Sequence, residues 1–521
     1  MNRTRKVLSA FVGMLIVSLM ASSVASASQG DEWNSAGGNR QNTRYQGSEH
    51  TLSVDNVSTL APKWVFTTGG DVSATPAVDS DTVYFPDWAG NLYAVDKITG
   101  QQRWMVNIAN ITGVSGDKAR ATPLITDDKL IIGTLGPFGG GGNVLALNKF
   151  TGALVWSTVA DNHPAAMITQ SASVWDGRVY VGVSSFEEGL ALFIPGYPCC
   201  SFRGSMLALD LNTGAILWKT YTVPDGYSGG AVWGSSPAID TKRSTVYIGT
   251  GNNYSVPQDV LNCVAAAGDN NNAKAACLDP NDNFDSIMAL DLKTGAIRWV
   301  TRAISYDAWT GDCIPFYGTG VNCPDPAGPD YDFGQAPGLF HVKLNGKPTD
   351  VVGAGQKSGQ YWALNADTGQ VIWETQAGPG GTNGGLQWGS AVDGQRVYTA
   401  DANSDLKSWT PLGGNSTTDG AWSGLDAVSG QILWQTAPPN GGSTSGPVTT
   451  ANGVVFGCSL DPNGYMYALD AATGDVLWSF ASGGSCLSGA AISDGMLYWG
   501  SGYSNLGIGT PNNKLYAFGL P

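Results

Sequence analysis

The stretch Met206-Leu-Ala-Leu-Asp210-Leu-Asn-Thr-Gly214-Ala-Ile-Leu-Trp218 is one of seven close variants of a phrase that recurs along this chain. Each variant has an apolar run, an Asp or Asn, a Thr-Gly or Ser-Gly pair, and then a Trp. The seven tryptophans are Trp104, Trp156, Trp218, Trp299, Trp373, Trp434 and Trp478. Because an Asp side chain opens a tight turn and Gly accepts a positive φ, each phrase predicts two antiparallel strands joined by a turn. A period of roughly 40 to 50 residues with this content predicts a β-propeller rather than a solenoid of helices.

The two ends of the chain supply one further blade. The stretch 63–68 (Lys-Trp-Val-Phe-Thr-Thr) reads as a Trp strand without a repeat in front of it, and 514–518 (Lys-Leu-Tyr-Ala-Phe) has no Trp strand behind it. Paired with each other, these stretches close a ring and remove most exposed sheet edges. The expected fold class is all-β: an eight-bladed β-propeller of four-stranded antiparallel blades, forming one domain over residues 28–521. The repeat tryptophans are expected to pack between blades.

Composition and charge limit the classes of protein and partner. Only 13% of the 521 residues are charged, whereas Gly numbers 71 and Trp 18, which suits a large all-β protein with many turns. The formal net charge of −15 disfavours nucleic acid and anionic membrane surfaces as partners.

The N-terminal stretch 1–27 predicts a cleaved signal peptide, with an uncleaved anchor helix as the alternative. It has a basic start, an apolar run too short to span a bilayer and a small-residue site at 25–27 (Ala-Ser-Ala). No later stretch is long and apolar enough to cross a membrane. The mature chain is therefore expected to be exported, either to the periplasm or into the medium.

The eight cysteines all follow this N-terminal stretch, and an even number in an exported chain predicts disulfide bonds. Their spacing suggests three local pairs: Cys263–Cys277, Cys313–Cys323 and Cys458–Cys486. Cys199 and Cys200 are adjacent, and a ring closed between neighbours about 3.8 Å apart would be strained and unusual. The sequence contains no Cys-x-x-Cys-His motif, so no c-type haem is expected.

Insertions concentrate in the middle blades. From Trp156 onward, successive repeat tryptophans lie 62, 81, 74 and 61 residues apart, and six of the eight cysteines fall in this part of the chain. Long loops on a rigid scaffold usually build a functional site. A plain structural propeller needs no such additions.

Four segments in or near these insertions combine polar and aromatic residues outside the repeat. They are 181–188 (Val-Gly-Val-Ser-Ser-Phe-Glu-Glu), 230–233 (Gly-Ala-Val-Trp), 249–252 (Gly-Thr-Gly-Asn) and 353–357 (Gly-Ala-Gly-Gln-Lys). With the repeat, they resemble the eight-bladed quinoprotein dehydrogenases, which hold pyrroloquinoline quinone (PQQ) with a calcium ion. Within that family the branch that oxidises polyvinyl alcohol is the most similar. The resemblance covers essentially all of the mature chain.

The resemblance implies roles for individual residues. Trp233 would form the floor under the PQQ ring, as suits a flat quinone that packs on an indole face. Asn252 and Glu187 would be calcium ligands, because Ca²⁺ binds roughly six to eight amide and carboxylate oxygens. Glu188 is the alternative to Glu187 if the register differs by one residue.

The catalytic base is placed at Asp332, which would also contact the metal. In the family the base is an Asp in a Trp-Asp-Phe-like phrase near calcium, but here Trp309 is followed by Thr310. The phrase Asp330-Tyr-Asp332-Phe-Gly follows a cysteine-bearing insertion and supplies the nearest match. Asp307 is the alternative.

Further cofactor contacts are implied by the same resemblance. Lys357 would hydrogen-bond the quinone oxygens and stabilise the reduced, anionic cofactor. Arg120 would meet a PQQ carboxylate, and Thr169 and Trp388 are further candidates for the pocket. In this family a disulfide ring of two adjacent cysteines covers the cofactor, so the resemblance implies a similar role for Cys199 and Cys200. In the methanol-oxidising members this ring lies in an earlier blade than Cys199 and Cys200 do here.

Two functions remain. The first is a PQQ- and calcium-dependent dehydrogenase that oxidises secondary alcohol groups, with polyvinyl alcohol as the expected substrate, to ketones. Calcium would polarise the quinone and Asp332 would accept the hydroxyl proton, and electrons would leave to a separate cytochrome c or another acceptor. The second is a non-catalytic, PQQ-like propeller that serves as an envelope binding or assembly scaffold. It predicts short, uniform blades and no convergent Glu, Asn, Asp and Lys side chains.

Overall fold

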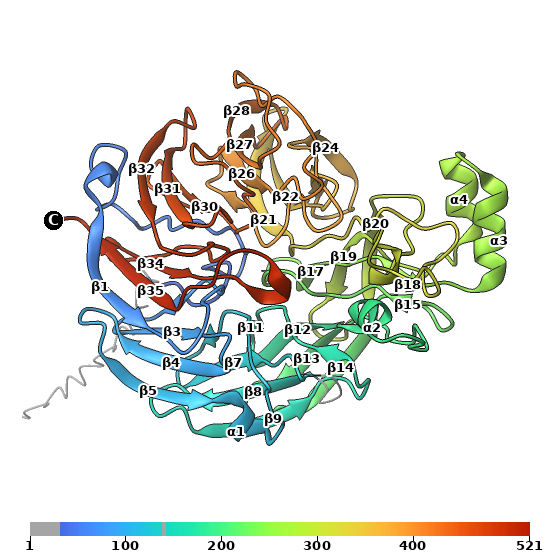
Figure 1. Ribbon diagram of the computed structural model, residues 1–521, viewed down its shortest axis with the longest axis horizontal. Helices are drawn as coiled ribbons and strands as arrows, with labels where there is room; N and C mark the ends of the chain where they lie inside the picture. Colours follow the sequence, from blue (N-terminus) through green and yellow to red (C-terminus); the bar gives the residue numbers. More distant parts are fainter. Residues whose placement is uncertain (1–31, 138–141) are drawn as a thin grey trace, which may run out of the picture. The chain divides into compact units, whose positions relative to one another are not determined.

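The computed structural model describes residues 32–137 and 142–521, so the predicted signal peptide at 1–27 lies outside the described residues. The described residues belong to one compact unit. The described strands make eight antiparallel blades around a common axis (Figure 1), which confirms the eight-bladed β-propeller. No helix among the described residues has the length and apolar character needed to cross a membrane.

The first four blades contain the following strands. Blade 1 contains β2 (Ala77–Val78), β3 (Thr82–Pro86), β4 (Asn91–Asp96) and β5 (Gln102–Asn107). Blade 2 contains β6 (Leu124–Ile125), β7 (Lys129–Gly133), β8 (Asn143–Asn148) and β9 (Leu154–Val159). Blade 3 contains β10 (Ala166–Met167), β11 (Ser173–Trp175), β12 (Arg178–Ser185), β13 (Ser205–Asp210) and β14 (Ile216–Tyr221). Blade 4 contains β16 (Ala238–Asp240), β17 (Thr245–Gly249), β19 (Ser286–Asp291) and β20 (Ile297–Arg302).

The second half of the ring repeats this plan. Blade 5 contains β21 (Gly338–Leu344), β22 (Lys347–Gly355), β23 (Gln360–Asn365) and β24 (Val371–Gln376). Blade 6 contains β25 (Ala391–Val392), β26 (Arg396–Asp401), β27 (Ala421–Asp426) and β28 (Ile432–Thr436). Blade 7 contains β29 (Thr449–Ala451), β30 (Val454–Cys458), β31 (Tyr465–Asp470) and β32 (Val476–Ala481). Blade 8 contains β33 (Ala491–Ser493), β34 (Met496–Ser501), β35 (Lys514–Gly519) and the N-terminal β1 (Ala61–Thr67).

Blade 8 closes the ring as the sequence predicted. Strand β1 pairs antiparallel with β35, from Ala61 opposite Gly519 to Thr67 opposite Lys514. The first strand of the chain therefore forms the outer edge of the last blade. This pairing brings the two ends of the described chain together in one blade and so closes the ring.

The repeat tryptophans link neighbouring blades, as expected. The indole Nε1 of Trp218 in blade 3 donates to the carbonyl of Leu292 in the turn of blade 4 (3.1 Å). A Cβ at the turn glycine Gly295, which has φ of 73°, would lie 2.6 Å from the Trp218 ring. The turn therefore requires Gly both for its backbone conformation and for contact with the indole. Equivalent bonds from Trp64, Trp104, Trp156, Trp299, Trp373, Trp434 and Trp478 run around the ring.

A segment before β1 connects the blades to one another near the axis of the ring, and no sequence pattern predicted it. We call residues 33–46 the hub segment, because its backbone and side chains bond to the innermost strands of seven blades. The contacted residues are Val78, Ile125, Ile239, Leu339, Val392, Thr450 and Ile492. The guanidinium of Arg40 also lies 4.7 Å from the Trp175 ring of blade 3. These contacts are all distant in sequence, so no local pattern predicts them.

Arg44 of the hub segment is a fully buried cation. Its side chain donates to the carbonyls of Val448 and Ala36 and to the hydroxyls of Thr75 and Thr449. Burial lowers the pKa of Arg44 to about 9. Its hydrogen bonds therefore connect the hub segment to blades 1 and 7.

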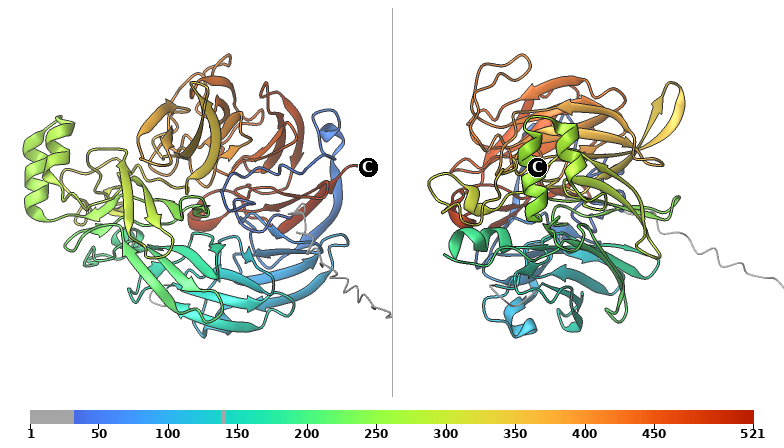
Figure 2. Two further views of the ribbon diagram at one scale, coloured as in Figure 1. Left: turned by 180° about the vertical axis from the view of Figure 1, so that it is seen from behind. Right: turned by 90° about the vertical axis from the view of Figure 1, so that its right-hand side faces the viewer.

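Helices occur in the connections rather than in the blades. They are α1 (Ile108–Thr112), α2 (Glu187–Phe193), α3 (Gln258–Ala267) and α4 (Asn271–Cys277), with 3₁₀ turns η1 (Val57–Thr59), η2 (Gly311–Cys313) and η3 (Asn505–Gly507). A two-stranded sheet of β15 (Ser228–Gly229) and β18 (Asn253–Ser255) adjoins them. Helices α3 and α4 form a hairpin that stands away from the blades in Figure 1 and in the left view of Figure 2. The middle insertions predicted from the spacing are thus present.

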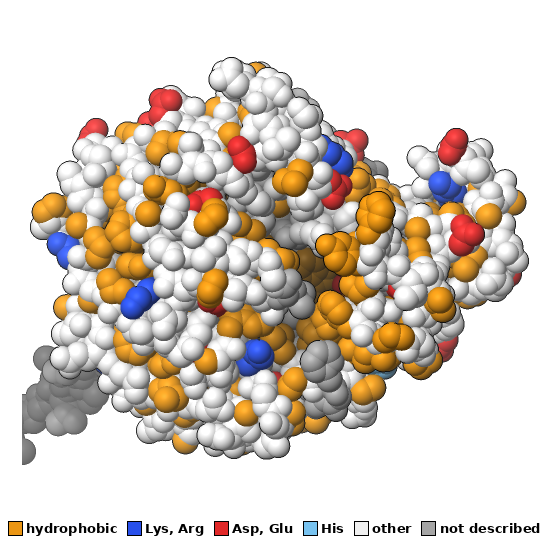
Figure 3. Space-filling model, in the orientation of Figure 1, with side chains coloured by type: hydrophobic (Ala, Val, Ile, Leu, Met, Phe, Trp, Pro, Cys, Tyr) orange, Lys and Arg blue, Asp and Glu red, His pale blue; other side chains and the backbone are white. Residues whose placement is uncertain are grey.

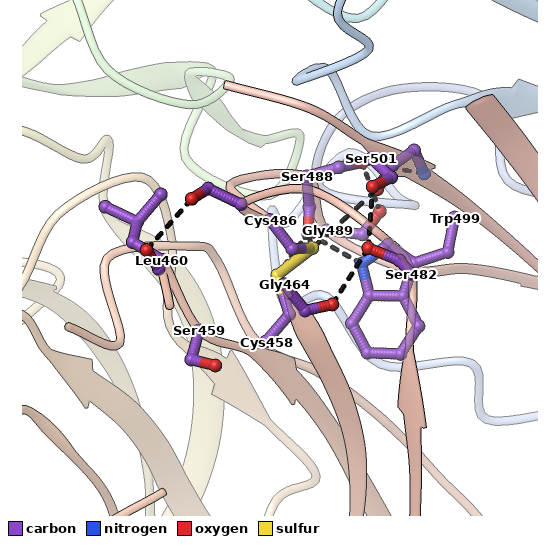
Figure 4. The surroundings of a disulfide bond; sticks show 12 residues. Cys458, Ser459, Leu460, Gly464, Ser482, Cys486, Ser488, Gly489, Trp499 and Ser501 are labelled. Atoms are coloured by element: carbon purple, nitrogen blue, oxygen red, sulfur yellow. Dashed lines mark hydrogen bonds between the residues drawn. A yellow bond between two sulfur atoms is a disulfide. The ribbon is translucent and has the colours of Figure 1, made fainter. Parts of the chain in front are cut away.

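The three local disulfides predicted from the spacing are confirmed, namely Cys263–Cys277, Cys313–Cys323 and Cys458–Cys486. Figure 4 shows the last of these beside Trp499, whose Nε1 donates to the carbonyl of Ser488 (2.7 Å). This bridge joins β30 of blade 7 to the loop that leads into blade 8. Cys199 and Cys200 are also joined, across a cis peptide bond, although the sequence marked such a ring as unusual.

Candidate active site

A group of buried charged side chains collects where the middle insertions meet the blades. Asp307, Asp330 and Asp332 come from the long connection between β20 and β21, and Lys357 follows β22. Their exposed fractions are 0%, 2%, 4% and 7%. Glu188 on the first turn of α2 faces the same group, since the charges of Lys357, Asp332 and Asp307 all act on it. We call these five residues the acidic cluster.

Asp332 has the most connections in the acidic cluster. Its Oδ2 accepts a hydrogen bond from Trp233 Nε1 (2.8 Å), and its Oδ1 accepts one from the backbone N–H of Asn252 (2.8 Å). Lys357 Nζ lies 3.5 Å from Oδ2. Three residues that the sequence predicted separately, Trp233, Asn252 and Lys357, thus meet at this carboxylate. A Cβ at Gly251 would lie 2.9 Å from Oδ2, so the chain passes close to Asp332 only because Gly occupies that position.

The side-chain amide of Asn252 is held by two backbone carbonyls. Its Nδ2 donates to the backbone carbonyls of Asn253 (3.0 Å) and Trp309 (2.9 Å). Since both amide protons are used there, the Oδ1 points the opposite way. Asn252 is 1% exposed, so its orientation is fixed by the protein.

Glu187, the residue expected as a metal ligand, accepts hydrogen bonds from the backbone in this structure. Its carboxylate accepts the N–H of Ser201 (2.9 Å) and of Phe202 (2.7 Å), and the hydroxyl of Tyr197 (3.2 Å). His163 Nε2 lies 3.4 Å away. Burial would raise the pKa of Glu187, but the hydrogen bonds from His163 and the two amides lower it below its usual value. These contacts suit a carboxylate that anchors a loop.

Glu188, the alternative from the sequence, has the properties expected of a ligand. Its Oε2 is buried and has no hydrogen-bond partner among the described residues. Burial raises the pKa of Glu188 to about 7, against the opposing effect of the Lys357 charge. A buried carboxylate oxygen without a partner is costly unless a cation or donor binds it. The geometry therefore fits Glu188 better than Glu187 as the ligand.

Asp330 and Lys357 form a buried ion pair. Lys357 Nζ donates to Asp330 Oδ1 (2.8 Å). Burial alone would lower the pKa of Lys357, but the charges of Asp330, Asp332 and Glu188 raise it above its usual value, so the ammonium stays protonated. Asp330 was not among the predicted site residues. Its place two residues before Asp332, in a Pro-Asp-Tyr-Asp phrase, was the available signal.

Asp307, the alternative base, contacts the backbone of the loop that carries Asp330 and Asp332. It accepts the backbone N–H of Asp330 (3.1 Å) and of Tyr331 (2.7 Å), and burial raises its pKa to about 6. Its neighbour Asp285 shares a side-chain hydrogen bond with it, and burial raises the pKa of Asp285 well above its usual value. Asp307 therefore shapes the loop that presents Asp330 and Asp332.

An aromatic pair borders the acidic cluster. The rings of Trp233 and Trp388 meet edge to face, with centroids 5.1 Å apart. Lys357 Nζ lies 5.6 Å from the Trp233 ring, and the Arg120 guanidinium lies 4.3 Å from the Trp388 ring. Thr169 Oγ1 donates to the carbonyl of Trp233 (2.9 Å). The four predicted pocket residues Arg120, Thr169, Trp233 and Trp388 are thus brought together.

The Cys199–Cys200 ring is attached to the same region through Glu187. The two residues after the ring, Ser201 and Phe202, donate their N–H groups to the Glu187 carboxylate. Helix α2 thus carries Glu187, which holds the ring, and next to it Glu188, which faces the acidic cluster. The first turn of α2 therefore contacts both the Cys199–Cys200 ring segment and the acidic cluster.

A cavity of about 280 Å³ opens beside these residues. Arg120 and Thr169 line it together with Trp88, Met167, Phe186, Leu190 and Tyr503. Figure 3 shows a hollow near the middle of this face, bordered by hydrophobic side chains. A small or slender apolar molecule with a few polar groups would fit such a pocket.

The donor set fits a hard cation held together with a planar organic group. Glu188, Asp332 and Asn252 offer oxygen atoms, and Trp233 and Trp388 offer flat apolar faces. Within the described ranges, no group of three or more His, Cys, Asp and Glu side chains is arranged to hold a metal by itself. A cation here would depend on the Asn252 amide and on oxygens from the bound molecule.

The scaffold alternative predicted short, uniform blades and no convergent polar side chains. The long insertions around α2, α3 and α4 and the acidic cluster do not agree with that prediction. Buried carboxylates and a lysine are expensive to place in a purely structural interior. The arrangement is that of a binding and reaction site.

Comparisons with known proteins agree with the geometry. A family model described as outer membrane protein assembly factor BamB (PQQ_2) matches residues 57–301 and 357–517. Polyvinylalcohol dehydrogenase from Sphingopyxis sp. (strain 113P3) is 31% identical, and the alignment covers 94% of this chain and 76% of that protein. Quinoprotein alcohol dehydrogenase PedH from Pseudomonas putida is 25% identical over 84% of this chain and 80% of that protein. The structure of quinohemoprotein alcohol dehydrogenase from Comamonas testosteroni superposes with a TM-score of 0.69 at 20% identity, over 95% of this chain and 81% of that one.

Proposed function

Because the chain belongs to the quinoprotein alcohol dehydrogenase family, we propose that it oxidises secondary alcohol groups to ketones with PQQ as its cofactor. We take polyvinyl alcohol as the polymer substrate, since the relative from Sphingopyxis carries that name. The observation that carries the proposal is the burial of Asp332, Lys357 and the Glu188 Oε2 atom together, with Trp233 bonded to Asp332. When bound, PQQ supplies the oxidising group, and a calcium ion beside it polarises that group.

Trp233 and Trp388 are the proposed contacts for the flat faces of the cofactor. Arg120 and Thr169, at the edge of this pair, are the proposed partners of its carboxylates and oxygens. Glu188, Asn252 and Asp332 are the proposed calcium ligands, with Glu188 in place of Glu187 because the Glu187 carboxylate already accepts backbone donors. The Cys199–Cys200 ring is proposed to limit the access of water to the cofactor from the side opposite to Trp233.

Asp332 is the proposed catalytic base. The indole N–H of Trp233 and the backbone N–H of Asn252 orient its carboxylate, and the Lys357 ammonium lies 3.5 Å from it. A carboxylate held in this way is proposed to accept the hydroxyl proton. Lys357 in turn is held by Asp330 and cannot swing away. Asp307, whose oxygens accept two backbone N–H groups, is proposed to position the loop rather than to take the proton.

Electrons are proposed to pass to a separate cytochrome c or another acceptor. All eight cysteines lie among the described residues and are paired in four disulfides, so none of them offers a thiol for haem attachment. Delivery in the periplasm or outside the cell is proposed from the predicted signal peptide at 1–27 and from the four disulfides.

The test is reconstitution of the purified apoprotein with PQQ and Ca²⁺. Binding is followed by quenching of tryptophan fluorescence, and turnover by dye-linked oxidation of 2-butanol and polyvinyl alcohol. We expect saturable binding and turnover that requires both additions. Asp332→Asn should keep PQQ binding and lose at least about a hundredfold in kcat, as removal of a general base predicts. Absence of PQQ binding, or full activity of Asp332→Asn, would contradict the proposal.

A further inference from the structure

An exposed apolar strip extends from the rim of the cavity. We call Phe193, Ile194, Phe316, Tyr317 and Val321 the rim strip. Phe316 and Tyr317 are 104% and 80% exposed, and Val321 is 79% exposed. Single exposed apolar residues are common, but five on two adjoining elements beside a cavity mark an interaction site.

The rim strip is continuous with the candidate active site through α2. The first turn of α2 carries Glu188, while Phe186 and Leu190 line the cavity. The ring of Phe186 stacks on that of Phe193, with centroids 6.0 Å apart and planes 16° apart. An apolar surface thus leads from the cavity wall to the outer end of the helix.

The second half of the rim strip is held against α2 by a braced loop. The loop begins at η2, where a Cβ at Gly311 would lie 3.1 Å from the Cβ of Leu192, so the two elements touch. A disulfide closes the loop from Cys313 to Cys323. Inside it, the Asp312 carboxylate accepts the hydroxyl of Thr319 (3.0 Å) and the N–H of Asn322 (2.7 Å). The loop therefore presents its aromatic rings to solvent on an ordered frame.

The chemistry of the rim strip favours a neutral ligand. The only charged side chains in 186–202 and 311–324 are Glu187, Glu188 and Asp312, and all three are directed inward. A charged polymer would find no counter-charge on this surface. A chain of alternating methylene and hydroxyl-bearing carbons has apolar edges that pack on aromatic rings, and its hydroxyls stay in water.

We propose that the rim strip binds the flanking part of a neutral aliphatic polyhydroxyl chain while one of its secondary hydroxyls reaches Asp332. The inference rests on the proposed function and adds the place where the polymer is held. The cavity admits only a short piece of such a chain, so a long substrate must cross the rim. Holding the flanking part raises the local concentration of hydroxyl groups at the site without altering the reacting residues.

The test compares the wild-type holoenzyme with a Phe316→Ser/Tyr317→Ser double variant. The control is Phe150→Ser, because Phe150 is also 66% exposed but lies in the turn of blade 2 between Asn148 and Gly152. We expect the double variant to raise KM for polyvinyl alcohol at least about tenfold and to change kcat/KM for 2-butanol less than about twofold. The control should match the wild type on both substrates.

Affinity electrophoresis in gels containing polyvinyl alcohol gives a readout that does not depend on activity. The wild type and the control should be retarded by the polymer, and the double variant should not. If the holoenzyme oxidises no alcohol but is retarded through the rim strip, the proposed function fails and the rim strip stands as a polymer site. Equal retardation of all three proteins, or equal kinetic losses on both substrates, would overturn the inference. A wild type that dimerises while the double variant stays monomeric in sedimentation would assign the rim strip to a second copy instead.

Discussion

Exchanging the neighbouring carboxyls Glu187 and Glu188 for amides should have opposite effects on the stability of the apoprotein. In Glu187→Gln the amide oxygen can take the place of only one carboxylate oxygen. If it replaces Oε2, which accepts the N–H of Ser201 and Phe202, the NH₂ group replaces Oε1 and can no longer accept the hydroxyl of Tyr197 or the second contact from Ser201 N–H. A buried donor left without an acceptor costs about 1–3 kcal/mol, and the lost bonds were charge-assisted. We therefore expect Glu187→Gln to lower the free energy of unfolding by about 2–5 kcal/mol.

Glu188→Gln should stabilise the apoprotein at alkaline pH. Burial raises the pKa of Glu188 from its ordinary value of 4.5 to about 7, so the folded state favours the protonated form. The stability contributed by this protonation is present below pH 4.5 and is lost as the pH rises through 7. Since about 1.4 kcal/mol corresponds to each pKa unit, the change from pH 5 to pH 8 costs the folded state roughly 2–3 kcal/mol. A glutamine cannot ionise, so its advantage should appear at pH 8 and disappear at pH 5.

Urea unfolding of both apoproteins at pH 5 and pH 8 measures these free energies. Calorimetric titration with Ca²⁺ in the presence of PQQ then separates ligand from anchor. Glu188→Gln should weaken calcium binding at least about a hundredfold, and the folded Glu187→Gln protein should lose less than about tenfold, as outer-shell changes do. If Glu187→Gln abolishes calcium binding while Glu188→Gln binds it normally and is less stable at pH 8, the assignment of the two residues is refuted.

Two further outcomes follow from residues away from the cluster. Asp401 is fully buried, and burial raises its pKa to about 7, so its stabilising protonation is lost as the pH rises through 7. Asp401→Asn should reduce the fall in the free energy of unfolding between pH 5 and 8 by roughly 2–3 kcal/mol, and an unchanged fall measured by urea unfolding at the two pH values would contradict this. Gly295→Ala should destabilise the protein by about 2–3 kcal/mol more than Gly113→Ala, because both glycines have φ near 73° but only Gly295 contacts Trp218; equal losses in chemical unfolding would show that the Trp contact is unimportant.

The fold could be predicted from the sequence because the repeat is local. One copy of the repeat contains the turn at Asp210, the positive φ of Gly214 and the packing of Trp218. Each copy therefore predicts one blade. The pairing of β1 with β35 followed from two stretches that lacked a partner. The hub segment could not be predicted, because its bonds to seven blades depend on the completed ring.

The candidate site was predicted as a set of residues but not in its register. Consecutive residues on a helix point about 100° apart, so nothing in a Glu-Glu pair shows which carboxyl faces the cluster. The loop of 303–337 decides this by bringing Asp307, Asp330 and Asp332 to one side of α2. The ion pair of Lys357 with Asp330 depends on the same loop, whose course is set by contacts distant in sequence.

The central claim is that the acidic cluster beside Trp233 holds PQQ and takes the proton from a secondary alcohol. The most direct measurement is stopped-flow absorbance of the bound cofactor after mixing the Ca²⁺- and PQQ-loaded protein with 2-butanol in the absence of any electron acceptor. We expect one round of cofactor reduction in the wild type, and a rate at least about a hundredfold lower in Asp332→Asn at equal cofactor occupancy. No spectral change in the loaded wild type, or equal rates in the two proteins, would contradict it.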